Sequence, residues 1–183
     1  MSKKAYVFLA EGFEEIEALT PVDILRRAGI DCTTVSISDK LEVTGSHNIT
    51  VKADILFSEG KFLDGDAIIL PGGLPGTTNL GKHSGLKELI EKYNKENKLI
   101  SAICAGPTIF ANMGLLNGIC ATCYPSMTDK LTGAIVKDDK CVYDKNILTS
   151  RGMGTAMDFA LKIVEILENK EVSDTIKNQV VYL

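Results

Sequence analysis

An alternation of short apolar runs with longer amphipathic segments is the feature that most constrains this chain. The apolar runs have the length of strands, and a strand that is apolar along its whole length must be covered on both faces. The expected strands are residues 5–10, 32–37, 67–70 and 99–103. The amphipathic segments have helical spacing and cover residues 14–27, 85–94, 107–113 and 155–167. This βαβ rhythm predicts an α/β fold, with a mostly parallel sheet and helices on both faces.

Turn residues add detail to this prediction. Gly29 and Gly114 each follow a helical segment, and glycine there suits a left-handed helix C-terminal cap. Residues 43–51 and 134–148 are expected to form short antiparallel additions to the sheet. Residues 119–124 have the composition of a further strand.

Length and charge limit the class of protein. A chain of 183 residues, 45% of them hydrophobic and without a repeat or linker, is expected to form one domain over residues 1–183. Its net charge of −4 argues against nucleic acid or an anionic membrane as partner, because phosphate binding needs a surplus of Lys and Arg. The apolar run near the amino terminus is too short for a signal peptide, and no run approaches membrane-spanning length.

The five cysteines do not form the pattern of a disulfide framework. They are odd in number and irregularly spaced, which favours a reducing, cytoplasmic setting. Cys120 and Cys123 have the spacing of a metal or redox pair. Because residues three apart on a strand point to opposite sides, we interpret this pair as structural and expect no metal.

Cys104 has the surroundings of a nucleophile. Ligands of parallel sheets bind beyond the carboxyl ends of the strands, where residues 11–17, 71–73 and 104–106 are expected to meet. Cys104 lies there between a strand and a helix that starts at Pro107, with small residues on both sides. A sharp strand–turn–helix elbow needs such small neighbours. The helix amino terminus should favour the thiolate, with a pKa of roughly 3.5–7.5, although free cysteines are also often simply buried.

The pair Gly72-Gly73 also follows an apolar strand. Glycine lets the backbone approach a ligand closely, and the Gly73 amide could donate a hydrogen bond to an oxyanion. A strained connection is the alternative. The segment lacks the lysine and the serine or threonine of a phosphate-binding loop, so nucleotide binding is not expected.

Glu17 falls on the apolar face of the first helix, whereas Glu15 is expected to point away toward the side of Arg26. Burial would keep Glu17 protonated, so that it could donate a hydrogen bond to a neighbouring thiolate. The helical wheel equally allows a surface carboxylate in the acidic first turn of the helix. His47 and His83 are the only histidines, and both fall in expected surface turns.

Five blocks of sequence together resemble the ThiJ/PfpI family, in particular its Parkinson-disease deglycase branch. They are AEGFEEIE (10–17), PVD (21–23), LPGG (70–73), AICAGP (102–107) and LTSRG (148–152). The resemblance runs nearly end to end and implies a flavodoxin-like three-layer sandwich, similar to class I glutamine amidotransferases, that forms a homodimer. It further implies Cys104 as nucleophile, Glu17 as its protonated partner, and the Gly73 and Ala105 amides as an oxyanion hole, in a pocket lined by Gly72, Tyr124 and Arg151.

The resemblance implies a cofactor-independent enzyme that converts methylglyoxal or glyoxal to a hydroxy acid, or repairs their early adducts on proteins. It also implies two alternatives: a redox-sensing, chaperone-like protein that acts through oxidation of Cys104, and a peptidase or amidotransferase-like hydrolase. Tyr124 stands before Pro125 where the human-like branch has a histidine. Since tyrosine is a poor base near neutral pH, the hydrolase alternative is weakened.

Overall fold

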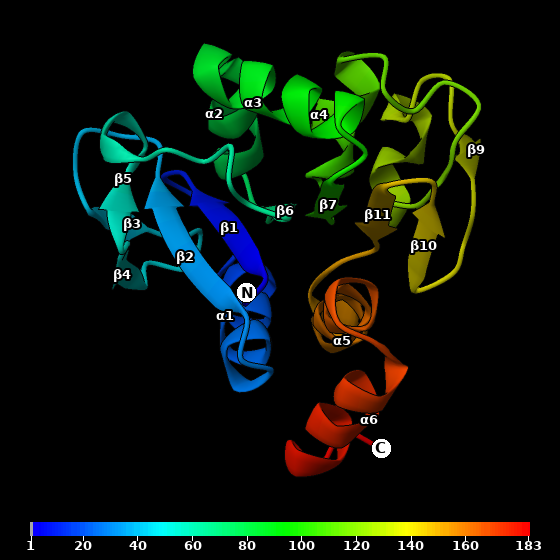
Figure 1. Ribbon diagram of the computed structural model, residues 1–183. Coiled ribbons are helices and arrows are strands. Elements are labelled where there is room, and N and C mark those ends of the chain that lie inside the picture. Colours follow the sequence, from blue (N-terminus) through cyan, green and yellow to red (C-terminus); the bar gives the residue numbers. More distant parts are fainter. Residues whose placement is uncertain (1) are drawn as a thin grey trace.

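A computed structural model describes residues 2–183 and has a seven-stranded sheet at its centre (Figure 1). The strands of this sheet are β1 (Lys4–Leu9), β2 (Asp31–Ser36), β5 (Ile55–Leu56), β6 (Ala67–Leu70), β7 (Leu99–Ile103), β10 (Cys141–Asp144) and β11 (Ile147–Ser150). Their spatial order is β10-β11-β7-β6-β1-β2-β5. Every neighbouring pair is parallel except the β10–β11 hairpin. The predicted mostly parallel sheet is confirmed.

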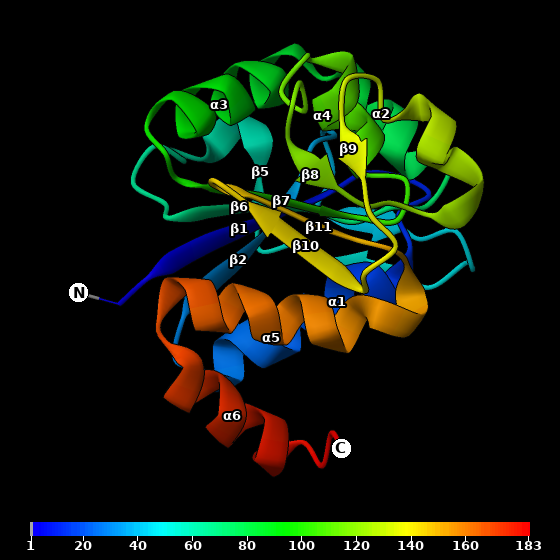
Figure 2. The ribbon, with the colours of Figure 1, turned by 90° about the vertical axis from the view of Figure 1, so that its right-hand side faces the viewer.

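Helices cover both faces of the sheet (Figure 2). On one face lie α1 (Glu15–Arg27) and α5 (Ala156–Leu167), with α6 (Lys170–Gln179) packed against α5. On the other lie α2 (Gly76–Lys82), α3 (Ser84–Lys95) and α4 (Pro107–Asn112). Within residues 2–183, no helix combines the length and apolar character that crossing a membrane requires.

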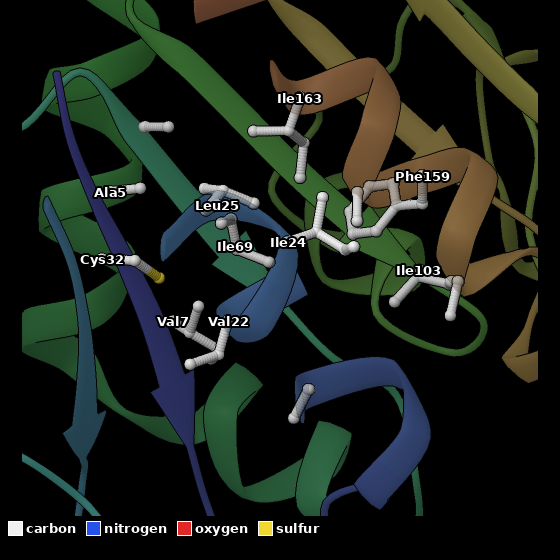
Figure 3. Packing of buried hydrophobic residues seen from close by; sticks show 14 of the residues in the cluster. Ala5, Val7, Val22, Ile24, Leu25, Cys32, Ile69, Ile103, Phe159 and Ile163 are labelled. Atoms are coloured by element: carbon white, nitrogen blue, oxygen red, sulfur yellow. The ribbon is translucent and has the colours of Figure 1, made fainter. Parts of the chain in front are cut away.

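The alternation of side chains along the central strands divides the core into two layers. On β6, Ile69 faces α1 and α5, whereas Ile68 and Leu70 belong to the layer beneath the opposite helices. Figure 3 shows the first layer, in which Ile24 and Phe159 lie over the sheet. Strands β6 and β7 are buried at every position, which explains why they are apolar except for Ser101, whose hydroxyl donates to the Ile68 oxygen at 2.8 Å.

Two small sheets accompany the large one. Strands β3 (Glu42–Thr44) and β4 (Thr50–Lys52) form the antiparallel ribbon predicted for residues 43–51. The hairpin predicted within residues 134–148 is present as β10–β11, with Lys145 at φ +53° in its turn. By contrast, β8 (Cys120–Ala121) pairs in parallel with β9 (Ile135–Val136), so this part of the expected antiparallel addition is wrong. The strand expected over residues 119–124 is reduced to the two residues of β8.

The sequence pattern did not predict two helices, α2 and α6. Helix α2 contains two glycines and two threonines, which have low helix propensity. Its backbone packs so closely on the loop after β1 that a Cβ at Gly76 would lie 2.6 Å from the Phe13 nitrogen. Helix α6 buries only Ser173 and Ile176, so it has almost no apolar stripe to detect.

Candidate active site

The three segments expected at the carboxyl edge of the sheet do meet there. The Glu14 backbone nitrogen donates to the Gly72 carbonyl oxygen at 3.0 Å, which joins the loop after β1 to the loop after β6. The Cys104 nitrogen donates to the Ser150 oxygen at 3.0 Å, which fixes the end of β7 against β11. These backbone bonds bring Glu17, at the start of α1, to the same place as Cys104.

Cys104 occupies a strained turn between β7 and α4. Its φ of +63° lies in the left-handed region, which a non-glycine residue adopts only where its surroundings hold it there. Small neighbours make the turn possible, because a Cβ at Gly106 would lie 2.9 Å from the Leu70 oxygen and 3.2 Å from the Ala102 Cβ. The turn therefore has the geometry of the predicted elbow, and only 9% of Cys104 is exposed.

Glu17 is completely buried at the base of this turn. Its Oε2 accepts a hydrogen bond from the Gly72 nitrogen at 2.9 Å, while its Oε1 is buried without a partner that meets hydrogen-bond geometry. Burial raises the pKa of Glu17 to about 7, and hydrogen bonds with Cys104 and Gly72 oppose the rise. Of the two placements of Glu17 that the helical wheel left open, the structure has the buried one. Near neutral pH this carboxyl can both give and accept a proton.

The pKa of the Cys104 thiol differs from the low value predicted from the sequence. Burial, followed by the charge of Glu17 and their mutual hydrogen bond, raises the pKa of Cys104 to about 12. The Ala105 and Gly73 amides lower it, as expected for the helix end, but they do not outweigh the first two causes. The predicted low thiol pKa is therefore wrong for the state in which Glu17 is ionised. In that state the proton shared by the pair rests on sulfur.

Gly72 and Gly73 are required for steric reasons. A Cβ at Gly72 would lie 2.6 Å from the Glu17 Oε2 and 2.7 Å from the Cys104 Cβ. Gly73 has a φ of +87°, and a Cβ there would lie 2.4 Å from the Glu14 nitrogen. The two glycines therefore let the loop after β6 pass close to both chemically active side chains.

Tyr124 lies beside Cys104, whereas Arg151 is held by a neighbouring loop. The Tyr124 nitrogen donates to the Cys104 oxygen at 3.0 Å, and its ring, 39% exposed, lies beside Gly152. A Cβ at Gly152 would be 3.3 Å from the Tyr124 Cδ2 and 3.8 Å from the Glu17 Oε1. The Arg151 guanidinium donates to the Asp138 carbonyl oxygen at 2.7 Å, so it is engaged by a neighbouring loop.

A cavity of about 530 Å³ opens on the far side of Ala105. Its walls come from α2, α4 and the segment 127–132, and they include Leu74, Thr77, Lys82, Ile109 and Lys130. Gly72, Tyr124 and Arg151 are not among the residues that line it. Of the predicted pocket residues, Gly72 and Tyr124 border Cys104 itself, Arg151 contacts Asp138, and the larger hollow begins next to Ala105.

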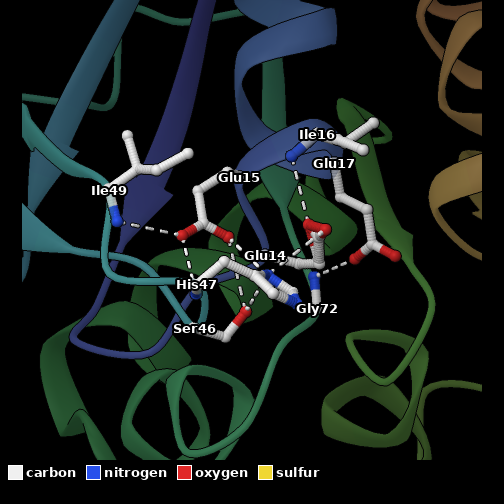
Figure 4. Close-up of polar contacts among 8 residues, drawn as sticks. All are labelled: Glu14, Glu15, Ile16, Glu17, Ser46, His47, Ile49 and Gly72. Carbon is white, nitrogen blue, oxygen red and sulfur yellow. Dashed lines mark hydrogen bonds and ion pairs between the residues drawn. The ribbon is translucent and has the colours of Figure 1, made fainter.

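Neither histidine contacts Cys104. The His47 Nδ1 lies 3.0 Å from the Glu15 Oε2, and the His83 Nδ1 accepts a hydrogen bond from the Leu86 nitrogen at the start of α3. Glu15, expected to point away from the apolar face toward the side of Arg26, is only 5% exposed, so this side of α1 is covered at its start. The β3–β4 turn folds over the start of α1 and covers it (Figure 4), and a helical wheel cannot show this.

The sequence analysis also did not single out Glu14. Its carboxylate caps α1 by accepting from the Ile16 nitrogen at 3.1 Å, and its charge contributes to the raised pKa of Glu17. The sequence pattern placed Glu14 inside the predicted helix 14–27, whereas the structure starts α1 at Glu15 and makes Glu14 its cap.

Fold and site together define a flavodoxin-like α/β protein with a cysteine on a strand–helix elbow and a buried glutamate beside it. The model of the DJ-1/PfpI family matches residues 3–166, and this chain belongs to that family. The chain is 40% identical over 173 residues to Protein dj-1beta of Drosophila melanogaster, covering 93% of this chain and 92% of the fly protein. It is 37% identical over 180 residues to the glutathione-independent glyoxalase DJR-1.2 of Caenorhabditis elegans, covering 95% and 94%.

A solved structure shows the same fold. The structure titled "Toxoplasma gondii DJ-1, oxidized" superposes with a TM-score of 0.95 at 36% identity, and the match covers 99% of both chains. The flavodoxin-like architecture implied by the sequence blocks is confirmed by this likeness.

Proposed function

We propose that this chain is a cofactor-independent glyoxalase that converts methylglyoxal or glyoxal to the corresponding hydroxy acid at Cys104. The observation that carries the proposal is that Cys104, held at φ +63°, and the fully buried Glu17 carboxyl meet at Gly72, where a Cβ would lie 2.7 Å from the Cys104 Cβ and 2.6 Å from the Glu17 Oε2. The name of the C. elegans relative, a glutathione-independent glyoxalase, supports the same reaction class.

The first step is addition of sulfur to the aldehyde carbon. Because the thiol pKa is raised to about 12 while that of Glu17 is about 7, ionised Glu17 accepts the thiol proton as the carbon–sulfur bond forms. The aldehyde oxygen gains negative charge, and we assign its stabilisation to the Ala105 and Gly73 amides, which favour negative charge at the neighbouring sulfur. Glu17 then returns the proton to this oxygen, giving a hemithioacetal.

The second step is an internal redox exchange between adjacent carbons. Glu17 removes the proton from the former aldehyde carbon, and the resulting enediol is protonated on the neighbouring carbon, which leaves a thioester on Cys104. Water hydrolyses the thioester, releasing lactate from methylglyoxal and restoring the thiol. The first carbon is oxidised and the second reduced, so the sequence needs no cofactor.

Repair of early aldehyde adducts on proteins is the second part of this proposal. Such adducts are hemithioacetals and hemiaminals of the same carbonyl compounds, so the same attack by Cys104 would apply to the aldehyde they release. Cys104 is buried to about nine-tenths, which favours small aldehydes over an adduct held on a folded protein surface.

A redox function is the second candidate. The similar Toxoplasma protein is described as oxidized in its title. If Cys104 of this chain is oxidised to a sulfinic acid, Glu17 in its protonated form is the neighbouring group that can donate to the new oxygen atoms. The hydrolase alternative gains no support, because both histidines have partners other than Cys104.

Turnover of methylglyoxal without glutathione tests the main proposal. Wild type should form lactate, Cys104→Ser should form none above background, and Cys120→Ser, a half-buried thiol on β8, should match wild type. Glu17→Gln should lose about 10²–10⁴-fold in kcat/KM, the usual range for an acid–base group. Equal lactate formation by Cys104→Ser would refute the nucleophile.

The pH profile distinguishes the two protonation states of Glu17. The mechanism needs the carboxylate as the accepting base, so kcat/KM should rise with pH and level off above about pH 7. Residual activity in Glu17→Gln should lack this step. A profile that falls through pH 7 would mean that the protonated carboxyl, with a preformed thiolate, is the active form.

A further inference from the structure

The cavity beside Ala105 lies along two helices that begin at the candidate active site. Helices α2 and α4 follow the neighbouring strands β6 and β7, on the face of the sheet opposite α1 (Figure 2). Both helices therefore start at the carboxyl edge of the sheet and run away from Cys104. They pack against each other, since a Cβ at Gly81 would lie 3.5 Å from the Ile109 Cγ1. The lining residues thus extend from Ala105, next to the nucleophile, to Lys82 at the end of α2.

This cavity is much larger than methylglyoxal needs. Its volume of about 530 Å³ lies within the range of pockets that hold organic ligands of moderate size. From Gly76 to Lys82, helix α2 rises by about 9 Å, because each helical residue adds about 1.5 Å. A substrate that reacts at Cys104 and also reaches Lys82 must therefore carry several carbons beyond its aldehyde.

The lining of the cavity is cationic and contains no carboxylate. Lys82 and Lys130 both line it, and none of the lining residues is Asp or Glu. Within residues 2–183, neither lysine takes part in an ion pair. The chain as a whole has a net charge of −4, so this positive wall differs from the rest of the molecule. A hollow lined by charge of one sign attracts ligands of the opposite sign.

The wall also contains a hydroxyl group without a partner. Thr77 is 5% exposed, and its Oγ1 is one of two buried side-chain polar atoms within residues 2–183 that make no hydrogen bond. The Thr77 nitrogen donates to the Gly73 oxygen at 2.9 Å, which places this residue one helical turn from the proposed oxyanion hole. A buried hydroxyl without a partner is unfavourable, and a helical threonine can adopt either of two χ1 rotamers. Rotation toward the cavity would let it donate to an anionic ligand.

We propose that this cavity is a substrate subsite for α-oxoaldehydes that carry a carboxylate at the far end of a short carbon chain. The inference rests on the proposed glyoxalase function and assigns its substrate class. The aldehyde reacts at Cys104, and the carbon chain lies against Leu74 and Ile109. The carboxylate meets the ammonium groups of Lys82 and Lys130.

One such compound is 4,5-dioxopentanoate. By the steps given for methylglyoxal, it takes up one water molecule and yields 2-hydroxypentanedioate. The aldehyde carbon is oxidised to a carboxylate, and the neighbouring ketone carbon is reduced to a secondary alcohol. The distant carboxylate takes no part in the chemistry, so its effect on turnover reports on binding alone.

Turnover of 4,5-dioxopentanoate and of its methyl ester tests the subsite, because the ester has the same chain without the charge. In wild type, kcat/KM for the acid should exceed that for the ester at least fivefold. The double variant Lys82→Gln/Lys130→Gln should lower this ratio at least threefold, which is within the range of two partly exposed charge pairs. Lys95→Gln removes an exposed lysine of α3 that does not line the cavity, and it should keep the wild-type ratio.

Binding to Cys104→Ser locates the ligand without turnover. The product 2-hydroxypentanedioate forms no covalent bond with the protein, and in a titration followed by NMR it should shift the amide signals of Gly81 and Asn112, which line the cavity. Unshifted signals at both residues would overturn the subsite.

Methylglyoxal separates failure of this inference from failure of the proposed function. Lactate formation by wild type, together with an acid-to-ester ratio below fivefold, would overturn the subsite and leave the glyoxalase function in place. A decrease of less than threefold in the double variant, or an equal decrease in Lys95→Gln, would do the same. Absence of lactate from wild type would overturn the glyoxalase function, and the substrate class would be lost with it.

Discussion

Gly72 is the residue on which the proposed nucleophile and the proposed acid–base group converge. Its missing side chain leaves room for the Glu17 Oε2 and the Cys104 Cβ, both closer than 3 Å to where a Cβ would stand. Its nitrogen donates to the same Oε2 atom. One backbone position therefore sets the distance between two side chains that come from different elements.

Gly72→Ala should separate Glu17 from Cys104 and reduce methylglyoxal turnover at least tenfold, because the new methyl must displace one of them. The expected loss is in kcat more than in KM, since alignment for proton transfer is what changes. Gly154→Ala is the matched control, because no atom lies within 4 Å of a Cβ there. Wild-type kcat in Gly72→Ala would show that the contact between Glu17 and Cys104 is dispensable.

At the scale of residues, the sequence predicted the features that depend on neighbours close in the chain. The elbow at Cys104 was predictable because its small flanking residues are adjacent in sequence. The raised pKa of the thiol was not predictable, because it is raised mainly by burial and by a carboxylate 87 positions earlier in the chain. The burial of Glu15 was not predicted for the same reason, since its hydrogen-bond partners belong to the turn at residues 46–49.

At the scale of elements, Glu15 connects the β3–β4 ribbon to α1. One carboxylate accepts two backbone amides and a hydroxyl from the turn, at His47, Ile49 and Ser46. The ribbon has only three residues in each strand and is not part of the large sheet. Its position therefore depends on this contact, on backbone hydrogen bonds to the loop after β1, and on the few apolar groups beneath it, such as Val43.

Glu15→Ala should loosen the ribbon before it affects the sheet, because it leaves the His47 and Ile49 amides without their acceptor. The loss of stability is expected to be about 1–3 kcal/mol, the usual cost of such unpaired groups. Hydrogen exchange should accelerate at residues 45–49 and stay unchanged in β6 and β7. Glu91→Ala, an exposed position on α3, serves as control. Unaltered exchange in the turn would contradict the anchoring role.

Helices and strands with a strong apolar pattern were predictable from the sequence. Those stabilised mainly by tertiary contacts were not. Helix α5 has a broad apolar stripe and was expected over residues 155–167, close to its observed bounds. Helix α2 exists because its glycines permit close packing on the loop after β1, a tertiary contact with no periodic signal. The parallel β8–β9 pair likewise depends on two segments brought together by the rest of the fold.

For the whole molecule, the family resemblance implies a homodimer. The apolar side chains of Ile16 and Leu19 on α1 are 52% and 38% exposed, and Ile49 on the ribbon turn is 53% exposed. Because exposed apolar groups of this size favour an interface, light scattering at micromolar concentration should give twice the chain mass. Ile16→Asp should shift the equilibrium toward monomer, and Leu63→Asp, an exposed apolar residue before β6, should not. A monomeric wild type would contradict this prediction.

The free energy of unfolding should depend on pH because Glu17 is buried. Its pKa rises from an ordinary value of 4.5 to about 7 in the folded protein, chiefly through burial. Between these two values the folded state binds more protons than the unfolded state, so the free energy of unfolding must fall as pH rises. The stabilising contribution of the protonated carboxyl is complete below pH 4.5 and is lost as pH passes through about 7. At 1.36 kcal/mol for each pKa unit, the change is roughly 3 kcal/mol.

Glu17→Gln removes this titration while keeping a side chain of the same shape. The difference in unfolding free energy between variant and wild type should therefore increase in favour of the variant, by up to roughly 3 kcal/mol, from pH 4.5 to pH 8. Below pH 8 the Cys104 thiol stays protonated in both folded and unfolded chains, because its pKa is raised from 9.0, so it adds nothing within this window. Urea unfolding at intervals across the range measures the difference. A difference that does not vary with pH would mean that Glu17 titrates normally, which would contradict its raised pKa and the activity step expected near pH 7.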